Sequence, residues 1–255
     1  MDGRPPGHYI TDQSVIDFHP VIETAPDAAP AADAPSAPAH QRRKAERPQE
    51  LLDAALALFV EKGFAATRAE EVARRAGVSK GTLYLYFESK EELLKAVIRE
   101  RLSSRIAAAA DFVASHDGDI ASLLRDVLTH WWSEVLHSDA SGVFKLIIGE
   151  VRNFPDIAEF YLREVVEPGQ RLLGGVVARG IASGEFRPLP VEMVVQSLVL
   201  PMVMLCVHKH SIGACQPNPT VDDSDAFIRQ HMDLLLHGLV AAPPDRAPSA
   251  GRVGA

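Results

Sequence analysis

Apolar side chains recur three and four positions apart along most of the chain between residues 47 and 240, which is the spacing of one face of an α-helix. The first such run follows Pro48, a residue tolerated at the first position of a helix, and it ends at Gly63. No segment shows sustained alternation of apolar and polar residues, as a half-buried strand would require. The pattern therefore predicts an all-α fold.

A denser pattern lies between Thr67 and Leu94, where helix start and stop signals follow one another closely. Thr67 and Glu70 stand three apart, as in a capping box, and predict a helix that begins with the residue after Thr67. Ser79 is placed to cap a second helix and Ser89 a third. Two short helices joined by a tight turn predict a helix-turn-helix, whose second helix enters a major groove of DNA.

The residues from Arg47 to Ile98, and above all GVSKGTLYLYFESKEELL, resemble the DNA-binding domain of the tetracycline-repressor (TetR) family. The resemblance covers about a fifth of the chain and implies a larger, all-helical second domain that binds an effector and forms a dimer. The expected parts are a disordered Pro/Ala-rich tail with a basic arm over residues 1–44, the helix-turn-helix domain over 45–93, the effector-binding and dimerisation domain over 94–240, and a flexible tail over 241–255.

The net charge of −8 argues against a nucleic-acid partner, but the charge is unevenly distributed along the chain. Residues 1–40 carry a net charge of −5, residues 41–105 a net charge of +4, and residues 106–255 a net charge of −7. The positive charge is thus concentrated where the helix-turn-helix is predicted, as contact with phosphates requires. The acidic remainder would suppress non-specific DNA binding.

The predicted recognition helix begins after Ser79, and DNA contacts are expected in its first turn. Backbone amides at the N-terminus of a helix favour anionic phosphate. Lys80 and Thr82 are placed to reach base edges or phosphates, and Gly81 lets the backbone come close. Further along, Tyr86 is assigned to DNA and the phenylalanine that follows it to the core of the small domain.

The TetR resemblance adds contacts outside that first turn. It implies that Tyr84 and Lys90 bind phosphate, and that Thr67 and Arg68 anchor the DNA backbone. The basic run at 42–44 is either an arm that follows phosphates or enters the minor groove, or a solvated junction between tail and domain. The complete set of expected DNA contacts is Arg42, Arg43, Lys44, Thr67, Arg68, Ser79, Lys80, Gly81, Thr82, Tyr84, Tyr86 and Lys90.

Beyond the helix-turn-helix, the periodicity predicts further helices up to residue 240. Residues 90–115 would form one long helix that joins the two domains. Residues 155–183 would form another, kinked at Pro168. Residues 191–210 and about 222–240 would form the last two helices, with a loop between them.

So short a recognition helix would bind tightly only as two copies on a near-palindromic operator, with half-sites about 34–36 Å apart. This argument and the resemblance both imply a homodimer. The last two helices supply the natural surface, because the first of them is more apolar than one buried face requires. The expected interface residues are Leu198, Met202, Leu205, Phe227 and Leu235.

Aromatic and apolar residues gather on the middle helices, where TetR-type proteins usually form their effector pocket. The expected lining is Trp131, Phe144, Ile148, Arg152 and Phe160, with Arg152 able to orient a polar group. The layout FKLIIGEVRNFP is similar to that of regulators of multidrug efflux operons, which suggests a small hydrophobic or aromatic effector.

Two other classes of protein stay open. An architectural DNA-binding protein would use the same fold without an effector. A metal-responsive regulator or an enzyme would use Cys206 and His210, which lie four apart on one helical face, although His208 cannot point at the same place. Harmless histidines at the end of a helix are the favoured interpretation. No metal, cofactor or catalytic residue is predicted, since familiar catalytic motifs are absent.

The sequence carries few signals of cellular location. The two cysteines make no disulfide framework, and the N-terminus lacks the apolar run of a signal peptide. The longest apolar stretch, from Val191 to Val207, is interrupted by polar residues and a proline, and is expected to fall short of a membrane span. We therefore expect a cytoplasmic protein with no membrane partner.

Overall fold

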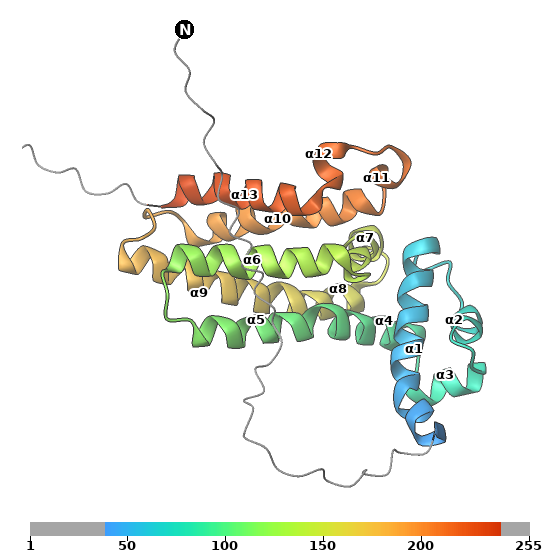
Figure 1. Ribbon diagram of the computed structural model, residues 1–255. Coiled ribbons are helices and arrows are strands. Elements are labelled where there is room, and N and C mark those ends of the chain that lie inside the picture. The colour runs from blue at the N-terminus through green and yellow to red at the C-terminus, as the bar shows by residue number, and fades with distance from the viewer. Residues whose placement is uncertain (1–38, 241–255) are drawn as a thin grey trace, which may run out of the picture. The chain divides into compact units, whose positions relative to one another are not determined.

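The computed structural model describes residues 39–240, and the side chains of residues 47–240 apart from that of Thr220. Within these residues the fold is all-α, as predicted, with one isolated bridge between Phe186 and Val240 (Figure 1). The expected tails at 1–38 and 241–255 lie outside the described residues.

The N-terminal part contains four helices followed by a π-helical turn and a fifth helix. They are α1 (Ala39–Lys62), α2 (Ala69–Arg75), α3 (Lys80–Tyr86), α4 (Lys90–Ile98), the π turn η1 (Arg99–Ser103) and α5 (Ser104–Ser115). Helices α2 and α3 pack against each other as the helix-turn-helix. Gly77 lies in the turn between them with a φ of 67°, a conformation that suits glycine because it has no Cβ.

The start of α1 corrects the prediction, because Pro48 lies inside the helix and not at its first position. The residues ahead of it are mostly good helix formers, and they extend the helix upstream although a proline there removes one backbone hydrogen bond. The expected basic arm, Arg42, Arg43 and Lys44, consequently falls within α1, and the placement of its side chains lies outside the described residues.

Two of the predicted N-caps of the small domain are confirmed and one is wrong. The Ser79 hydroxyl accepts the Thr82 N–H at 3.0 Å, and the Ser89 hydroxyl accepts the Glu92 N–H at 3.1 Å. In α2, however, Arg68 is the N-cap residue. Its backbone N–H donates to the carboxylate of Glu71 at 3.1 Å. The capping residue therefore follows Thr67 by one position.

The C-terminal part is built from the remaining helices. They are α6 (Ile120–His137), α7 (Ala140–Glu150), α8 (Pro155–Tyr161), the π turn η2 (Leu162–Val166), α9 (Glu167–Ser183), α10 (Val191–Lys209), α11 (Ile212–Cys215), α12 (Pro219–Asp222) and α13 (Ser224–Leu239). Helix α6 packs against α5, α9 and α13, and α10 packs against α7, α9 and α13 (Figure 1).

Both long predicted helices are continuous but contain a π turn. The helix over 90–115 runs as α4, η1 and α5, and the helix over 155–183 runs as α8, η2 and α9. The irregularity expected at Pro168 therefore begins ahead of it, at η2, in keeping with the habit of helices to deform at π turns. The loop expected over 211–220 contains the short α11 and the first half of α12.

Helix α10 is apolar on more than one side. Met202, Leu205 and Cys206 are buried in the core, whereas Leu200 and Met204 are exposed. By length and composition alone, Val191–Cys215 could cross a membrane, so the expectation that this stretch falls short was wrong. One such helix does not by itself indicate a membrane protein, since core helices pass the same test.

Candidate nucleic-acid interface and effector cavity

The recognition helix α3 turns one apolar side chain inward and several residues outward. Leu83 is fully buried against the rest of the small domain. Lys80, Gly81, Tyr84 and Leu85 are exposed, and Leu85 is 84% exposed. A side chain this open on a recognition helix is available for apolar contact with a thymine methyl group. Leu85 is not among the DNA contacts expected from the sequence.

The first turn of α3 is organised by short polar contacts. The Ser79 and Thr82 hydroxyls lie 2.9 Å apart, which adds to the backbone cap between the same residues. The Lys80 ammonium lies 2.5 Å from the Glu70 carboxylate, on α2. This hydrogen bond raises the pKa of Lys80 and lowers the pKa of Glu70. Lys80 is therefore charged and already paired in the absence of DNA.

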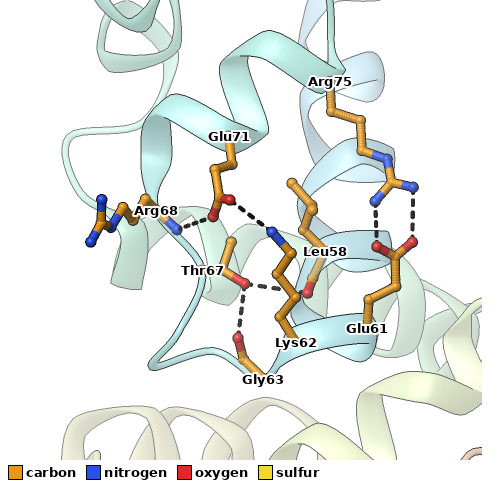
Figure 2. Close-up of polar contacts among 8 residues, drawn as sticks. All are labelled: Leu58, Glu61, Lys62, Gly63, Thr67, Arg68, Glu71 and Arg75. Atoms are coloured by element: carbon orange, nitrogen blue, oxygen red, sulfur yellow. Dashed lines mark hydrogen bonds and ion pairs between the residues drawn. The ribbon is translucent and has the colours of Figure 1, made fainter.

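Thr67 and Lys90, both expected to hold phosphate, are directed into the protein. Thr67 is 1% exposed, and its hydroxyl donates to the carbonyls of Gly63 at 2.8 Å and Leu58 at 3.2 Å (Figure 2). The Lys90 ammonium donates to the carbonyls of Phe64 at 2.8 Å and of Thr67 at 3.1 Å. It also lies 4.3 Å from the centre of the Phe64 ring. These two residues therefore fix the loop between α1 and α2.

Arg68 is exposed, and Figure 2 shows its guanidinium pointing away from the surrounding polar network. The network itself joins α1 to α2. Glu71 accepts from the Arg68 N–H and pairs with Lys62 at 2.7 Å, while Glu61 pairs with Arg75 at 2.8 Å (Figure 2). Tyr86, also expected at the DNA, is half-buried against the core like the phenylalanine after it.

A cavity of about 220 Å³ lies among the helices of the C-terminal part. Its wall is formed by apolar residues of α5, α6, α7, α9 and α10 and of the α8–η2 junction. The glutamines Gln170 and Gln196 are exposed at its edge, together with Leu200. The site is therefore a mostly apolar cavity with a few polar groups, which is how small-molecule sites are usually built.

The side chains of Trp131 and Trp132 both line this cavity. Their rings meet edge-to-face, with centres 4.4 Å apart, and Trp132 also packs on Phe144 at 5.7 Å. Both indole nitrogens are buried, and neither has a hydrogen-bond partner among the described residues. Buried polar groups normally have a partner, so each of these two residues of the cavity wall carries an unsatisfied N–H donor.

Two of the five predicted lining residues, Trp131 and Phe144, do line the cavity. The other three do not. Ile148 is 55% exposed, because Leu146 and Ile147 are the residues of this turn of α7 that face the core. Arg152 is exposed in the turn that follows α7. Ile148, Arg152 and Phe160 thus lie outside the wall of this cavity.

Phe160 is buried, but away from the cavity. Its ring lies within 6 Å of the cationic groups of Lys95, Arg99 and Arg163. The next residue, Tyr161, lines the cavity instead, and burial strongly raises the pKa of its phenol. Consecutive helix residues point about 100° apart, so the choice between these two rings required the orientation of α8.

Helix α7 connects the cavity to the small domain. Phe144 lines the cavity, while the adjacent Lys145 donates its ammonium to the Val60 carbonyl at 3.2 Å, near the end of α1. At the end of α7, the Glu150 carboxylate accepts the Phe64 N–H at 3.0 Å. Helix α7 also approaches α1 closely at Gly142, where a Cβ would stand 2.5 Å from a methyl of Val60.

Cys206 and His210, the two residues considered as metal ligands, have other surroundings in the structure. Cys206 is buried, and burial raises the pKa of its thiol to about 12. The His210 Nε2 lies 2.8 Å from the Ser141 hydroxyl, in a contact between α10 and α7. Across residues 39–240, the structure shows no group of three or more His, Cys, Asp or Glu side chains able to hold a metal ion. The metal alternative therefore gains no support.

The residues of α10 that were expected at the dimer interface lie in the core of their own chain. Leu198, Met202 and Leu205 are at most 4% exposed and pack within their own chain. Phe227 and Leu235 on α13 are partly buried against the same core. The outward face of α10 carries a different row, at spacings of four, three and four: Met193, Ser197, Leu200 and Met204. On α13 the corresponding exposed residue is Leu234, at 73%.

Comparison with known proteins gives matches over both parts of the chain. Residues 51–97 match the family described as bacterial regulatory proteins, tetR family, and residues 114–222 match the family described as tetracyclin repressor-like, C-terminal domain. The HTH-type transcriptional repressor KstR2 of Rhodococcus jostii is 30% identical over 200 residues, which cover 78% of this chain and 93% of that protein.

Solved structures share the fold. The transcriptional regulator FadR from Bacillus subtilis, in complex with stearoyl-CoA, superimposes with a TM-score of 0.62 and 23% identity, over 74% of this chain and 98% of that one. The ketosteroid transcriptional regulator KstR2 of Mycobacterium tuberculosis superimposes with a TM-score of 0.59 and 21% identity, over 77% of this chain and 96% of that one.

Proposed function

Since this chain belongs to the TetR family of bacterial transcriptional regulators, we propose that it is a homodimeric repressor that a small apolar effector releases from its operator. The observation that carries this proposal is the placement of α7. It lines the cavity with Phe144, contacts the end of α1 through Lys145, and contacts the segment after α1 through Glu150. A ligand in the cavity thereby acts on an element that contacts the DNA-binding part.

The DNA contacts are proposed for the exposed residues of α3 and the start of α2. Lys80, Thr82 and Leu85 would meet base edges, and Tyr84 and Arg68 would meet phosphates. Ser79 and Gly81 complete the first turn, where free backbone amides favour phosphate. Repression follows from occupation of two successive major grooves by the two α3 helices of a dimer, which would block the promoter.

The effector is proposed to be an apolar molecule that also carries a hydrogen-bond acceptor. The cavity wall supplies the apolar contacts, and the unpartnered indole N–H groups of Trp131 and Trp132 would donate to a carbonyl or similar oxygen. Gln170 and Gln196 offer further polar contacts at the edge. In FadR from Bacillus subtilis the bound molecule is stearoyl-CoA, which combines a long apolar chain with a thioester carbonyl. The effector proposed for this chain shares that combination of an apolar part and a carbonyl oxygen.

The dimer is proposed to form through the outward faces of α10 and α13. Met193, Leu200, Met204 and Leu234 are each at least half exposed, and together they form an apolar surface that a monomer would leave in water. A two-fold axis would set the same row of one protomer against that of its partner. The regulator would work in the cytoplasm, where its DNA lies.

Release is proposed to follow from a shift between two states. Ligand in the cavity would displace α7 and the α4–α5 helix, and so change the distance between the two α3 helices of the dimer. The operator binds one of these distances better, so the ligand moves the population toward the weaker binder. A coupling of about 3 kcal/mol would weaken DNA binding about 150-fold.

The proposal is tested by binding purified protein to fluorescent DNA from its own upstream region while apolar compounds with and without a carbonyl are added. Saturable binding by two protomers per site, relieved by one class of carbonyl compound, is the expected result. Tight binding that no compound relieves would contradict the proposal and favour an architectural DNA-binding protein.

A further inference from the structure

Glu70 on α2 is joined to Lys80, the first residue of α3, across the turn of the helix-turn-helix. Its Oε1 lies 2.5 Å from the lysine Nζ, and each side chain is 53% exposed. The capping of α2 is performed by Glu71 and not by Glu70. Ion pairs this exposed contribute little to folding stability. The pair therefore has no evident task in the fold, yet it determines where the Lys80 charge is held.

The position of the Lys80 ammonium leaves it partly available for DNA. The group has three donors, and one of them is engaged by the Glu70 carboxylate. The Tyr84 ring, one turn further along α3, lies 5.8 Å from the same nitrogen. A lysine held at the start of the recognition helix can still donate to guanine O6 or N7 in a major groove. To follow a phosphate elsewhere, Lys80 must leave the carboxylate.

We propose that Glu70 is a specificity-determining residue, which restrains Lys80 at the first turn of α3 and thereby favours base acceptors over phosphates. Phosphate contacts are the source of binding to DNA of any sequence, so this restraint lowers non-specific affinity in particular. Glu70 acts through Lys80, as a positioning residue, and needs no contact with DNA. The inference goes beyond the proposed function and rests on its assignment of α3 to the DNA.

The test compares Glu70→Gln with the unmodified protein on two duplexes. One is selected by the unmodified protein from a random-sequence library, and the other is a scrambled duplex of the same composition. Glu70→Gln should raise affinity for the scrambled duplex about two- to fivefold, the range set by one exposed ion pair. It should leave affinity for the selected duplex nearly unchanged. The salt dependence on scrambled DNA should steepen by about 0.9, the slope of one additional phosphate contact.

Two further proteins separate this role from a simple loss of negative charge. Glu61→Gln removes the same charge from the exposed Glu61–Arg75 pair and should leave the specificity ratio unchanged. In a Lys80→Ala background, Glu70→Gln should have no effect, since there is no ammonium left to restrain. Thermal unfolding of Glu70→Gln should match that of the unmodified protein.

An equal gain in Glu61→Gln, a gain that persists without Lys80, or an unchanged ratio in Glu70→Gln would each overturn the inference. Failure of the unmodified protein to enrich any duplex from the library is a different result. It would overturn sequence-specific recognition by α3 itself, and the role of Glu70 with it.

Discussion

The carboxylate of Glu150 accepts the backbone N–H of Phe64 at 3.0 Å, and so joins residues 86 positions apart in the sequence. The two residues belong to the end of α7 and to the segment that follows α1. A second contact lies beside this hydrogen bond, where the rings of Phe64 and Phe154 meet edge-to-face with centres 4.8 Å apart. These contacts therefore join the end of α7 to the segment that leads into the helix-turn-helix.

Removing the acceptor should weaken the link between cavity and DNA. In Glu150→Ala the Phe64 N–H loses its partner, so operator affinity without ligand should change little, while the ligand-induced loss of affinity should shrink by about 0.5–2 kcal/mol. The measurement is the DNA dissociation constant with and without the effector. Glu150→Gln keeps an acceptor oxygen and serves as the matched control. An unchanged ligand response in Glu150→Ala would show that α7 does not carry the coupling.

Thr67 should matter for stability and not for DNA contact. Replacing it by valine keeps the shape but removes the buried hydroxyl that donates to Gly63 and Leu58, so the free energy of unfolding should fall by about 1–3 kcal/mol. Arg68→Ala, at the exposed neighbouring position, should leave stability unchanged and weaken binding to all DNA alike. Denaturant unfolding and DNA titration of both variants decide between these roles. Normal stability in Thr67→Val would contradict the assignment.

Filling the cavity should produce a repressor that no longer responds. Val165 is buried and lines the cavity, so Val165→Phe places extra carbon atoms in the space of about 220 Å³. DNA binding should persist while the effector fails to relieve it. Leu162→Phe, on the same π turn but 51% exposed and outside the cavity wall, should respond normally. A normal response in Val165→Phe would place the effector elsewhere.

A charge on the outward face of α10 should separate the protomers. Met204 is 61% exposed in a single chain, and Met204→Arg would bury a guanidinium in the proposed interface, at a cost of several kcal/mol. Sedimentation should then report the mass of one chain in place of two, with loss of operator binding. Ile212→Arg, on α11 and 67% exposed, should remain dimeric. A dimeric Met204→Arg protein would move the interface to another surface.

His210 should make stability depend on pH. Burial first, and then the charges of Lys209 and Lys145, lower its pKa from the usual 6.5. The unfolded chain thus takes up this proton at a higher pH than the folded chain, so the contribution is complete above about pH 6.5 and is lost as the pH falls below it. The difference in unfolding free energy between the unmodified protein and His210→Gln should shrink from about pH 8 to about pH 5. A constant difference would contradict the shift.

Local signals predicted what local physics decides. Ser79 and Ser89 each cap the helix expected of them, because a hydroxyl beside free backbone amides caps a helix whatever the tertiary fold. The capping box predicted at Thr67 does not form, because its hydroxyl donates to the carbonyls of Leu58 in α1 and of Gly63 just after it. The N-cap residue of α2 is therefore the adjacent Arg68, and the helix begins at Ala69.

Questions of orientation were less predictable. Helix α10 is apolar on opposite sides, so the sequence could not tell which row faces the core, and Leu198 and Met202 were placed on the wrong side. Lys90 illustrates a different limit. Its ammonium donates to backbone carbonyls 23 to 26 positions earlier in the chain. The loop that carries them approaches α4 only through tertiary packing, which the local sequence does not reveal.

The two π turns have a consequence for the alignment of helix faces. Leu94, Ile98, Leu102 and Ile106 are all buried, although a spacing of four rotates a regular α-helix by about 40° at each step. The π turn at η1 contains more residues per turn than an α-helix, so it offsets that rotation and keeps these four side chains on one face. Deleting a single residue from η1 would therefore swing Ile106 and the rest of α5 away from the cavity, while every cap and contact of the small domain up to α4 kept its register.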